Sequence, residues 1–246
     1  PRAGWTPHGH SPQIPPKEPG LSIHDYEKKA DQVSIPTATL ITCHSNADFD
    51  ALAAMCAAAL IYGPCDVLFP GTQEANLQTF YQELKERPGA APGCTFLDDR
   101  VPDFSKYGRL VAVDTRRRSR LRHVWPLLDN PGTRIEVWDH HPETSDDVHA
   151  HVCHAEICGA VTTLLIEEIQ KLNIAVPRET ATVLGLGIYS DTGSFSFSSV
   201  TQRDFAAAGW LLGRGMDINI ISEKTAFSMT KEHIRALNAL LESAQT

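Results

Sequence analysis

One imidazole and two carboxylates lie within seven residues of the sequence, at His44, Asp48 and Asp50. The apolar run 39–43 before them predicts a buried strand, and the alanine-rich stretch 51–62 after them predicts a helix. Open α/β sheets place their ligands in such strand-to-helix turns. Bunched carboxylates repel one another unless a positive charge lies between them, so a divalent metal explains the cluster. The structural alternative is that Asp50 caps the helix and Asp48 is a turn residue.

Three more apolar segments end in an acidic residue. Parallel strands bring their carboxyl ends to one edge of a sheet, so residues distant in sequence can converge there. A cap or a loop explains each acid alone, but no such explanation covers all four sites. Imidazole and carboxylate together suit Mn²⁺, with Mg²⁺ or Co²⁺ as alternatives. The three segments are 110–113 followed by Asp114, 135–138 followed by Asp139, His140 and His141, and 184–190 followed by Asp191.

These motifs, in this order, resemble those of the DHH phosphoesterase superfamily, over about residues 38 to 225. Within this superfamily, the amino-acid sequence of several stretches is most similar to the branch that is fused to CBS modules and to a tRNA nucleotidyltransferase of the CCA-adding, poly(A)-polymerase-like type. The four motifs are HSNADFDA at 44–51, VAVD at 111–114, DHHP at 139–142 and GIYSDTGSF at 187–195.

The resemblance implies a site for two metal ions, preferably Mn²⁺. It further implies that a water-derived nucleophile attacks phosphorus, so that no protein nucleophile is needed. We expect Asp114, His140 and His141 to be catalytic, with His141 contacting the substrate phosphoryl group or aiding the leaving group; an orienting role is its alternative. By motif match, His44 and Asp48 hold one ion, Asp50 and His140 hold the other, and Asp114 and Asp191 complete the set, with Asp114 bridging.

Four arginines follow the Asp114 segment closely, at positions 116, 117, 118 and 120. Arginine grips phosphate with two parallel hydrogen bonds, and Arg116 is nearest the expected metal edge, so it is the candidate substrate-binding arginine. For Arg118 and Arg120 we favour a solvated helix start. The stretch 159–163 opens a helix whose N–H groups could bind an anion, or whose small residues could reflect tight packing.

Composition narrows the class of protein. The net charge of −8 argues against broad coating of nucleic acid, although it leaves room for a local basic patch. The six cysteines show no CxxC spacing, which favours free thiols in a reducing cytoplasm. No apolar run reaches the roughly eighteen residues that span a bilayer, and the amino terminus does not resemble a signal peptide. We therefore expect a soluble cytoplasmic protein with no membrane partner.

Strands and helices alternate from residue 38, which predicts an α/β fold with a largely parallel sheet flanked by helices. We expect three parts: a flexible proline-rich segment 1–36 (with a short helix at 22–33 at most), a phosphoesterase domain 37–228, and an amphipathic connecting helix within 229–246. The family resemblance implies a second, smaller lobe after such a helix; we expect this chain to lack it, and further domains could follow. The remaining predicted strands are 66–69, 95–97 and an edge strand at 148–153, and the helices are 74–86, 159–172, 178–189 and 201–212, the last with a Thr201/Asp204 capping box.

Three functions fit these observations. The favoured one is a Mn²⁺-dependent phosphodiester hydrolase acting on an oligonucleotide, a cyclic dinucleotide or an RNA 3′ end, in keeping with tRNA processing. The second is a pyrophosphatase or exopolyphosphatase, for which we would expect denser Lys and Arg around the product phosphates. The third is a non-catalytic nucleotide-binding regulatory module, but a degenerate site would have lost a ligand, and all six expected ligands are present. The sequence leaves the oligomeric state open.

Overall fold

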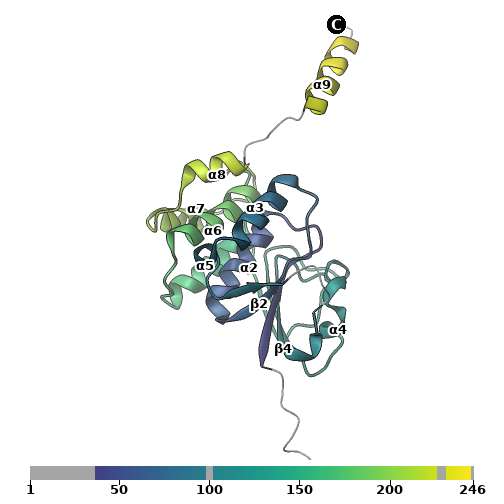
Figure 1. Ribbon diagram of the computed structural model, residues 1–246, viewed down its shortest axis with the longest axis vertical. Coiled ribbons are helices and arrows are strands. Elements are labelled where there is room, and N and C mark those ends of the chain that lie inside the picture. The colour runs from purple at the N-terminus through teal and green to yellow at the C-terminus, as the bar shows by residue number, and fades with distance from the viewer. Residues whose placement is uncertain (1–36, 98–101, 226–230, 245–246) are drawn as a thin grey trace, which may run out of the picture. The chain divides into compact units, whose positions relative to one another are not determined.

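The computed structural model describes residues 37–97, 102–225 and 231–244 (Figure 1). The expected segment 1–36 lies outside the described residues. Six strands form one sheet in the order β3-β2-β1-β4-β5-β6, and every pairing is parallel. The α/β fold with a parallel sheet is thereby confirmed. The strands are β1 (Ala38–Thr42), β2 (Cys65–Leu68), β3 (Cys94–Phe96), β4 (Tyr107–Val113), β5 (Arg134–Asp139) and β6 (Val152–Ala155).

The strand order reverses between β1 and β4. The chain runs outward from β1 to β3, returns to pair β4 with β1, and then continues to β6. In the β1–β4 pair, Ile41 lies opposite Val111 and Thr42 opposite Ala112, so the two strands end side by side. The crevice at such a reversal, outside the carboxyl ends of the strands, is the usual ligand site of open α/β sheets.

The larger core lies between the sheet and the helices α2 (Phe49–Tyr62), α5 (Val161–Lys171) and α6 (Arg178–Asp191). Every residue of α2 from Phe49 to Ala59 is buried, because its alanines let neighbouring helices approach closely. A Cβ at Gly187 of α6 would lie 2.6 Å from the Cβ of Ala53 and 3.0 Å from Oδ1 of Asp50. This glycine therefore sets the α2–α6 spacing directly beneath the metal edge.

The opposite face of the sheet carries a smaller core. Leu121, Val124 and Leu127 pack there against apolar residues of β4 and β5. Leu121 lies between two 3-10 turns, Arg118–Arg120 and Arg122–Val124. Val124 ends the second turn, and Leu127 lies in the short helix α4 (Trp125–Leu128). Burying each of the two leucines contributes about 1.5–3 kcal/mol. This packing fixes the arginine-bearing loop that follows β4.

The remaining helices are α3 (Ala75–Lys85), α7 (Gln202–Leu212), α8 (Ile218–Thr225) and α9 (Lys231–Ser243). The predicted capping box at the start of α7 is present. Helix α8 was not predicted. No helix in the described ranges is long and apolar enough to cross a membrane.

The predicted edge strand 148–153 is wrong in position, since β6 spans Val152–Ala155. The reason is a competing partner. Val148 donates its N–H to the carbonyl of Arg116 at 2.7 Å, and Asp147 bridges to Arg117, so these residues pair with the loop after β4. Only from His151, whose N–H donates to the carbonyl of Ile135 at 2.8 Å, does the chain follow β5.

Candidate metal centre

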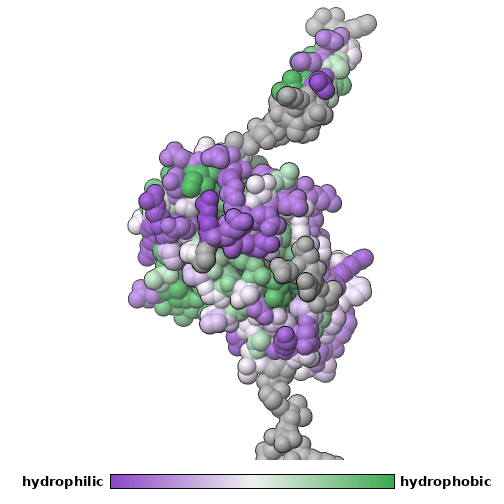
Figure 2. All heavy atoms as spheres, in the orientation of Figure 1, coloured by the Kyte–Doolittle hydropathy of each residue, from purple (hydrophilic) through white to green (hydrophobic). Residues whose placement is uncertain are grey.

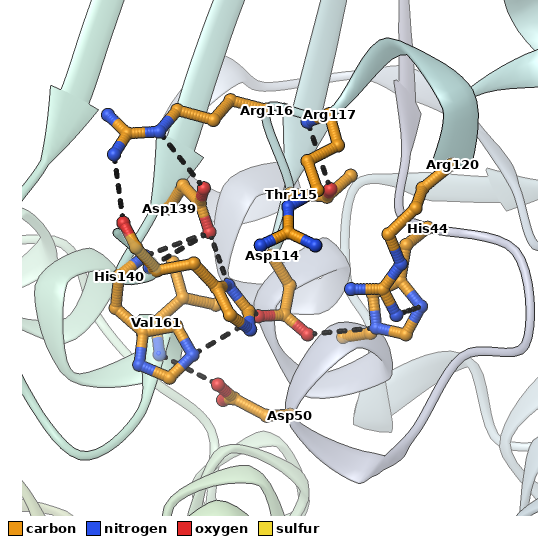
Figure 3. Close-up of polar contacts among 12 residues, drawn as sticks. His44, Asp50, Asp114, Thr115, Arg116, Arg117, Arg120, Asp139, His140 and Val161 are labelled. Carbon is orange, nitrogen blue, oxygen red and sulfur yellow. Dashed lines mark hydrogen bonds and ion pairs between the residues drawn. The ribbon is translucent and has the colours of Figure 1, made fainter. Parts of the chain in front are cut away.

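The six residues predicted as metal ligands converge at the carboxyl edge of the sheet, around the strand reversal. Figure 3 labels His44, Asp50, Asp114 and His140 among them. Five follow a strand or open α2, whereas Asp191 is the last residue of helix α6. They form two sets, each with its potential ligand atoms within 4.8 Å of one another. One set is His44, Asp48 and Asp114, and the other is Asp50, His140 and Asp191.

Asp114 lies between the two sets. Its Oδ2 is 3.1 Å from Nε2 of His44, and its Oδ1 is 3.4 Å from Nε2 of His140. Its backbone is left-handed at φ 59°, which is unusual for a side-chain-bearing residue, and its N–H donates to the carbonyl of Trp138 at 2.8 Å. Burial opposes ionisation, but hydrogen bonds from His140 and His44 hold the pKa of Asp114 at about 2. Asp114 is therefore a carboxylate that faces both sets.

Backbone carbonyls orient the two histidines. Nδ1 of His140 lies 3.0 Å from the carbonyl of Cys158, and Nδ1 of His44 lies 3.0 Å from the carbonyl of Ser45. A proton on each Nδ1 leaves Nε2 with a free electron pair directed at the carboxylates. Although burial alone would lower it, hydrogen bonds to Asp114 raise the pKa of both histidines to about 10. Without a cation, both rings are therefore protonated at neutral pH.

Two buried atoms indicate that a cation belongs here. Asp114 Oδ1 and His140 Nε2 are both buried and lie 3.4 Å apart as an ion pair, but neither atom makes a hydrogen bond of good geometry among the described residues. Buried polar atoms are rarely left unpaired, because each costs about 1–3 kcal/mol. A divalent ion between these atoms would satisfy both, and imidazole with carboxylates is a suitable donor set for one. The residues present thus fit a metal.

Helix α5 positions Asp50. Oδ2 of Asp50 accepts the N–H of Val161 at 2.7 Å, and Oδ1 of Asp50 accepts the N–H of Thr162 at 3.1 Å. Burial, helped by the charges of Asp114 and Asp191, raises the pKa of Asp50 well above its ordinary value. Burial likewise raises the pKa of Asp191 to about 6. The helix start at 159–163 therefore binds a carboxylate of the protein itself, a role that the sequence did not reveal.

Asp204 of α7 in turn fixes that helix start. It is fully buried and accepts the N–H of Gly159 at 2.9 Å, the hydroxyl of Thr163 at 2.7 Å and the N–H of Thr201 at 2.7 Å. A Cβ on Gly159 would lie 2.8 Å from the Asp204 carboxylate, so only glycine fits. The carbonyl of Cys158 contacts Nδ1 of His140, and the N–H of Val161 donates to Asp50. By fixing this helix start, Asp204 therefore controls the positions of the predicted metal ligands His140 and Asp50. Sequence reasoning noticed it only as a helix cap.

His141 lies beside the two ligand sets, with Nδ1 3.8 Å from Oδ1 of Asp114, and is held by Asp139. Oδ1 of Asp139 accepts Nδ1–H of His141 at 2.7 Å and the backbone N–H of His140 at 3.0 Å. The imidazole of His141 is 38% exposed, whereas Asp139 is buried. This arrangement leaves Nε2 of His141 accessible. Asp139 was given no role from the sequence, although its place at the head of the Asp-His-His triplet was a signal.

The structure gives Arg116 a different role from the one predicted. Its Nε lies 2.9 Å from Oδ2 of Asp147, and its Nη2 donates to the carbonyl of His141 at 2.9 Å. Arg116 thus braces the loop after β5. Arg120, expected to be solvated, instead places Nη2 2.7 Å from Nδ1 of His44. In Figure 3 the side chain of Arg117 extends toward Asp114, and that of Arg120 extends toward His44.

Sequence comparison shows which known proteins this domain is similar to. The sequence matches no family model. It is 39% identical over 207 residues to the A-adding tRNA nucleotidyltransferase of Geobacter sulfurreducens, a match that covers 84% of this chain and 23% of that protein. It is 30% identical over 130 residues to the bifunctional oligoribonuclease and PAP phosphatase NrnA of Thermus thermophilus, which covers 52% of this chain and 38% of that protein. The chain thus spans less than half the length of either relative.

Solved structures share the fold. An exopolyphosphatase-related protein from Bacteroides fragilis superimposes with a TM-score of 0.64 at 16% identity, over 90% of this chain and 64% of its own. A putative family II inorganic pyrophosphatase from Methanococcus jannaschii gives a TM-score of 0.52 at 18% identity, over 82% and 61%. These relatives, this fold and the four ordered motifs together support a DHH-superfamily phosphoesterase domain. Within it, the chain is similar to a segment of an A-adding tRNA nucleotidyltransferase.

Proposed function

We propose that this domain is a Mn²⁺-dependent hydrolase of phosphodiesters in short oligonucleotides or at RNA 3′ ends. The observation that carries the proposal is the pair of ligand sets joined by Asp114, which belongs to the first set and lies 3.4 Å from Nε2 of His140 in the second. Two imidazoles and four carboxylates favour Mn²⁺, with Mg²⁺ or Co²⁺ as alternatives. The similarity to a tRNA nucleotidyltransferase supports a place in tRNA 3′-end metabolism, in the cytoplasm, within a longer polypeptide that could include CBS modules.

In the proposed mechanism, His44, Asp48 and Asp114 would hold one ion, and Asp50, His140, Asp191 and Asp114 the other. Two such ions would supply Lewis acidity and activate water for in-line attack at phosphorus. His141 donates Nδ1–H to Asp139, so its Nε2 is the atom that exchanges a proton with the leaving oxygen.

Arg120 is the residue that we propose binds the phosphoryl group of the substrate. When Nε2 of His44 binds a cation, the proton sits on Nδ1 and is donated to the Ser45 carbonyl. A protonated Nδ1 cannot accept a hydrogen bond from Arg120, so the guanidinium of Arg120 is available for a phosphoryl oxygen.

The alternative functions receive less support. A phosphoanhydride hydrolase would need dense cationic contacts to both product phosphates, and the candidate contacts toward the site are Arg117 and Arg120. A non-catalytic regulatory module does not require six intact ligand residues at one edge of a sheet. The diester therefore remains the proposed substrate.

The test is product release from a panel of substrates with Mn²⁺ or Mg²⁺: dinucleotides, cyclic dinucleotides, RNA ending in CCA, pyrophosphate and polyphosphate. We expect release of mononucleotide from linear diesters that is abolished by EDTA and restored by Mn²⁺. Preferential release of phosphate from pyrophosphate or polyphosphate would replace the proposal with the anhydride function. No turnover of any substrate by metal-loaded protein would favour the regulatory module.

A further inference from the structure

The segment after Asp114 concentrates positive charge in an acidic chain. Residues 115–128 contain five arginines and no aspartate or glutamate, whereas the whole chain has a net charge of −8. The metal-edge loop is the start of this segment, and α4 is its end. A local basic surface thus extends away from the catalytic edge.

Three of the five arginines keep their charge available. Arg116 is neutralised by Asp147, and Arg118 donates to Asp129 at 2.6 Å. By contrast, within the described parts of the chain, Arg117, Arg120 and Arg122 form no ion pair with a carboxylate. Unpaired guanidinium groups in a row are suited to a ligand that carries repeated negative charge.

An exposed tryptophan lies at the far end of the row. Trp125 is 41% exposed, and its Nε1–H donates to the carbonyl of Arg118 at 3.2 Å, which fixes the indole plane. The guanidinium carbons of Arg118 and Arg122 lie 5.7 Å and 5.8 Å from the ring centroid. Large aromatic side chains are usually buried, and an indole held at the surface beside arginine is a stacking platform for bases.

The segment is held rigidly against the metal centre. The N–H of Ser45, next to His44, donates to the carbonyl of Arg120 at 3.0 Å, and the N–H of Arg118 donates to the carbonyl of Asp146 at 2.8 Å. The backbone is therefore bonded on both sides, and the guanidinium of Arg120 reaches His44 (Figure 3). The strip formed by Arg117, Arg120, Arg122 and Trp125 is a preorganised surface continuous with the catalytic edge.

We propose that this strip binds the single-stranded RNA that leads to the scissile 3′ phosphodiester. Arg117, Arg120 and Arg122 contact successive backbone phosphates, and a base stacks on Trp125. The inference rests on the proposed function, because it assumes that the strand ends at the metal centre. It makes the preferred substrate a strand several nucleotides long.

The first test measures binding without catalysis. Fluorescence anisotropy of a labelled ten-nucleotide RNA is followed in EDTA with the 246-residue chain. We expect Trp125→Ala to weaken binding about tenfold, since one stacked base contributes that much, and Trp125→Phe to retain most of it. Arg122→Ala should reduce the slope of log K against log salt by about 0.7, the value for one phosphate contact on a single strand.

A matched control exists in the same chain. The guanidinium carbon of Arg214 lies 3.2 Å from the ring centroid of Trp210. This pair is at the carboxyl end of α7, whereas Asp204 is in the first turn of that helix. Arg214→Ala makes the same charge change at a second Arg–Trp pair and should leave RNA binding unaltered. Equal losses in Arg122→Ala and Arg214→Ala, or none in either, would overturn the strip. So would displacement of the RNA by polyglutamate at equal charge concentration, which would indicate an acidic protein partner.

Hydrolysis of bis(p-nitrophenyl) phosphate with Mn²⁺ separates the two proposals. We expect Trp125→Ala to lower kcat/KM for the ten-nucleotide RNA about tenfold more than for this small diester. If the small diester were hydrolysed but RNA binding were unchanged in Trp125→Ala and Arg122→Ala, the RNA-binding strip alone would be refuted. RNA binding through the strip with no hydrolysis of either substrate would refute the catalytic proposal alone.

Discussion

Replacing Asp204 by asparagine should weaken metal binding although Asp204 touches no ligand residue. The carboxylate is fully buried and accepts hydrogen bonds from Gly159, Thr163 and Thr201. Asparagine has the same shape but only one acceptor oxygen, so its NH₂ group must face at least one N–H donor. Hydrogen bonds to a buried charge contribute about 1.5–3 kcal/mol each, so losing one or two costs about 3 kcal/mol.

The loss should reach the metal centre through the start of α5. Once Gly159 is released, the carbonyl of Cys158 and the N–H of Val161 no longer fix His140 and Asp50. Disturbing such supporting contacts typically costs 10–100-fold in metal affinity, so we expect about that loss for one of the two Mn²⁺ ions.

The assays are urea unfolding of metal-free protein, followed by circular dichroism, and Mn²⁺ titration by calorimetry. Asp217 provides the control: it accepts the N–H groups of Asn219 at 3.0 Å and Ile220 at 3.4 Å at the start of α8 and contacts none of the ligand residues. Asp217→Asn should cost about 1 kcal/mol of stability and leave Mn²⁺ affinity unchanged. If Asp204→Asn destabilised the fold yet bound both ions with normal affinity, the positioning role would be refuted.

Four further results are expected. Asp114→Asn should abolish turnover and lower Mn²⁺ stoichiometry below two; near-normal activity would contradict its shared position between the two sets. His141→Ala should keep both ions in a metal assay and lose about 10²–10⁴-fold in rate, whereas loss of Mn²⁺ would mean that it is a ligand. The pKa values of His44 and His140 are raised to about 10 without metal, so calorimetry at pH 7.5 in buffers of different ionisation enthalpy should show about two protons released when Mn²⁺ binds; no proton release would contradict this. For the same reason, the metal-free fold should lose stability as the pH rises from about 6.5 to 10. Gly187→Ala should cost about 1–3 kcal/mol in thermal unfolding, since the added methyl group meets Ala53 at 2.6 Å; an unchanged Tm would mean that α6 shifts freely.

The sheet and the convergence of the site were predictable because local sequence determines them. Buried parallel strands are continuous apolar runs, and a polar residue directly after such a run lies at the carboxyl edge wherever the strand sits in the sheet. His44, Asp114 and His140 illustrate this rule. The order of the strands, which places β1 beside β4, required the structure.

What the sequence concealed depends on contacts between distant segments. Arg116 looked available because its partner Asp147 lies 31 residues away, and Arg120 looked solvated because its contact with His44 spans 76 residues. The edge strand was misplaced for the same reason, since Val148 pairs with the loop after β4. Asp204 reads as an ordinary cap in sequence, and only the fold brings Gly159 to it.

Anomalous diffraction from crystals grown with Mn²⁺ tests the paired-metal centre most directly. Two peaks about 3.5–4 Å apart are expected, one beside His44 and Asp48, the other beside Asp50, His140 and Asp191, with Asp114 contacting both. A single peak, or peaks that do not touch Asp114, would contradict the two-metal account.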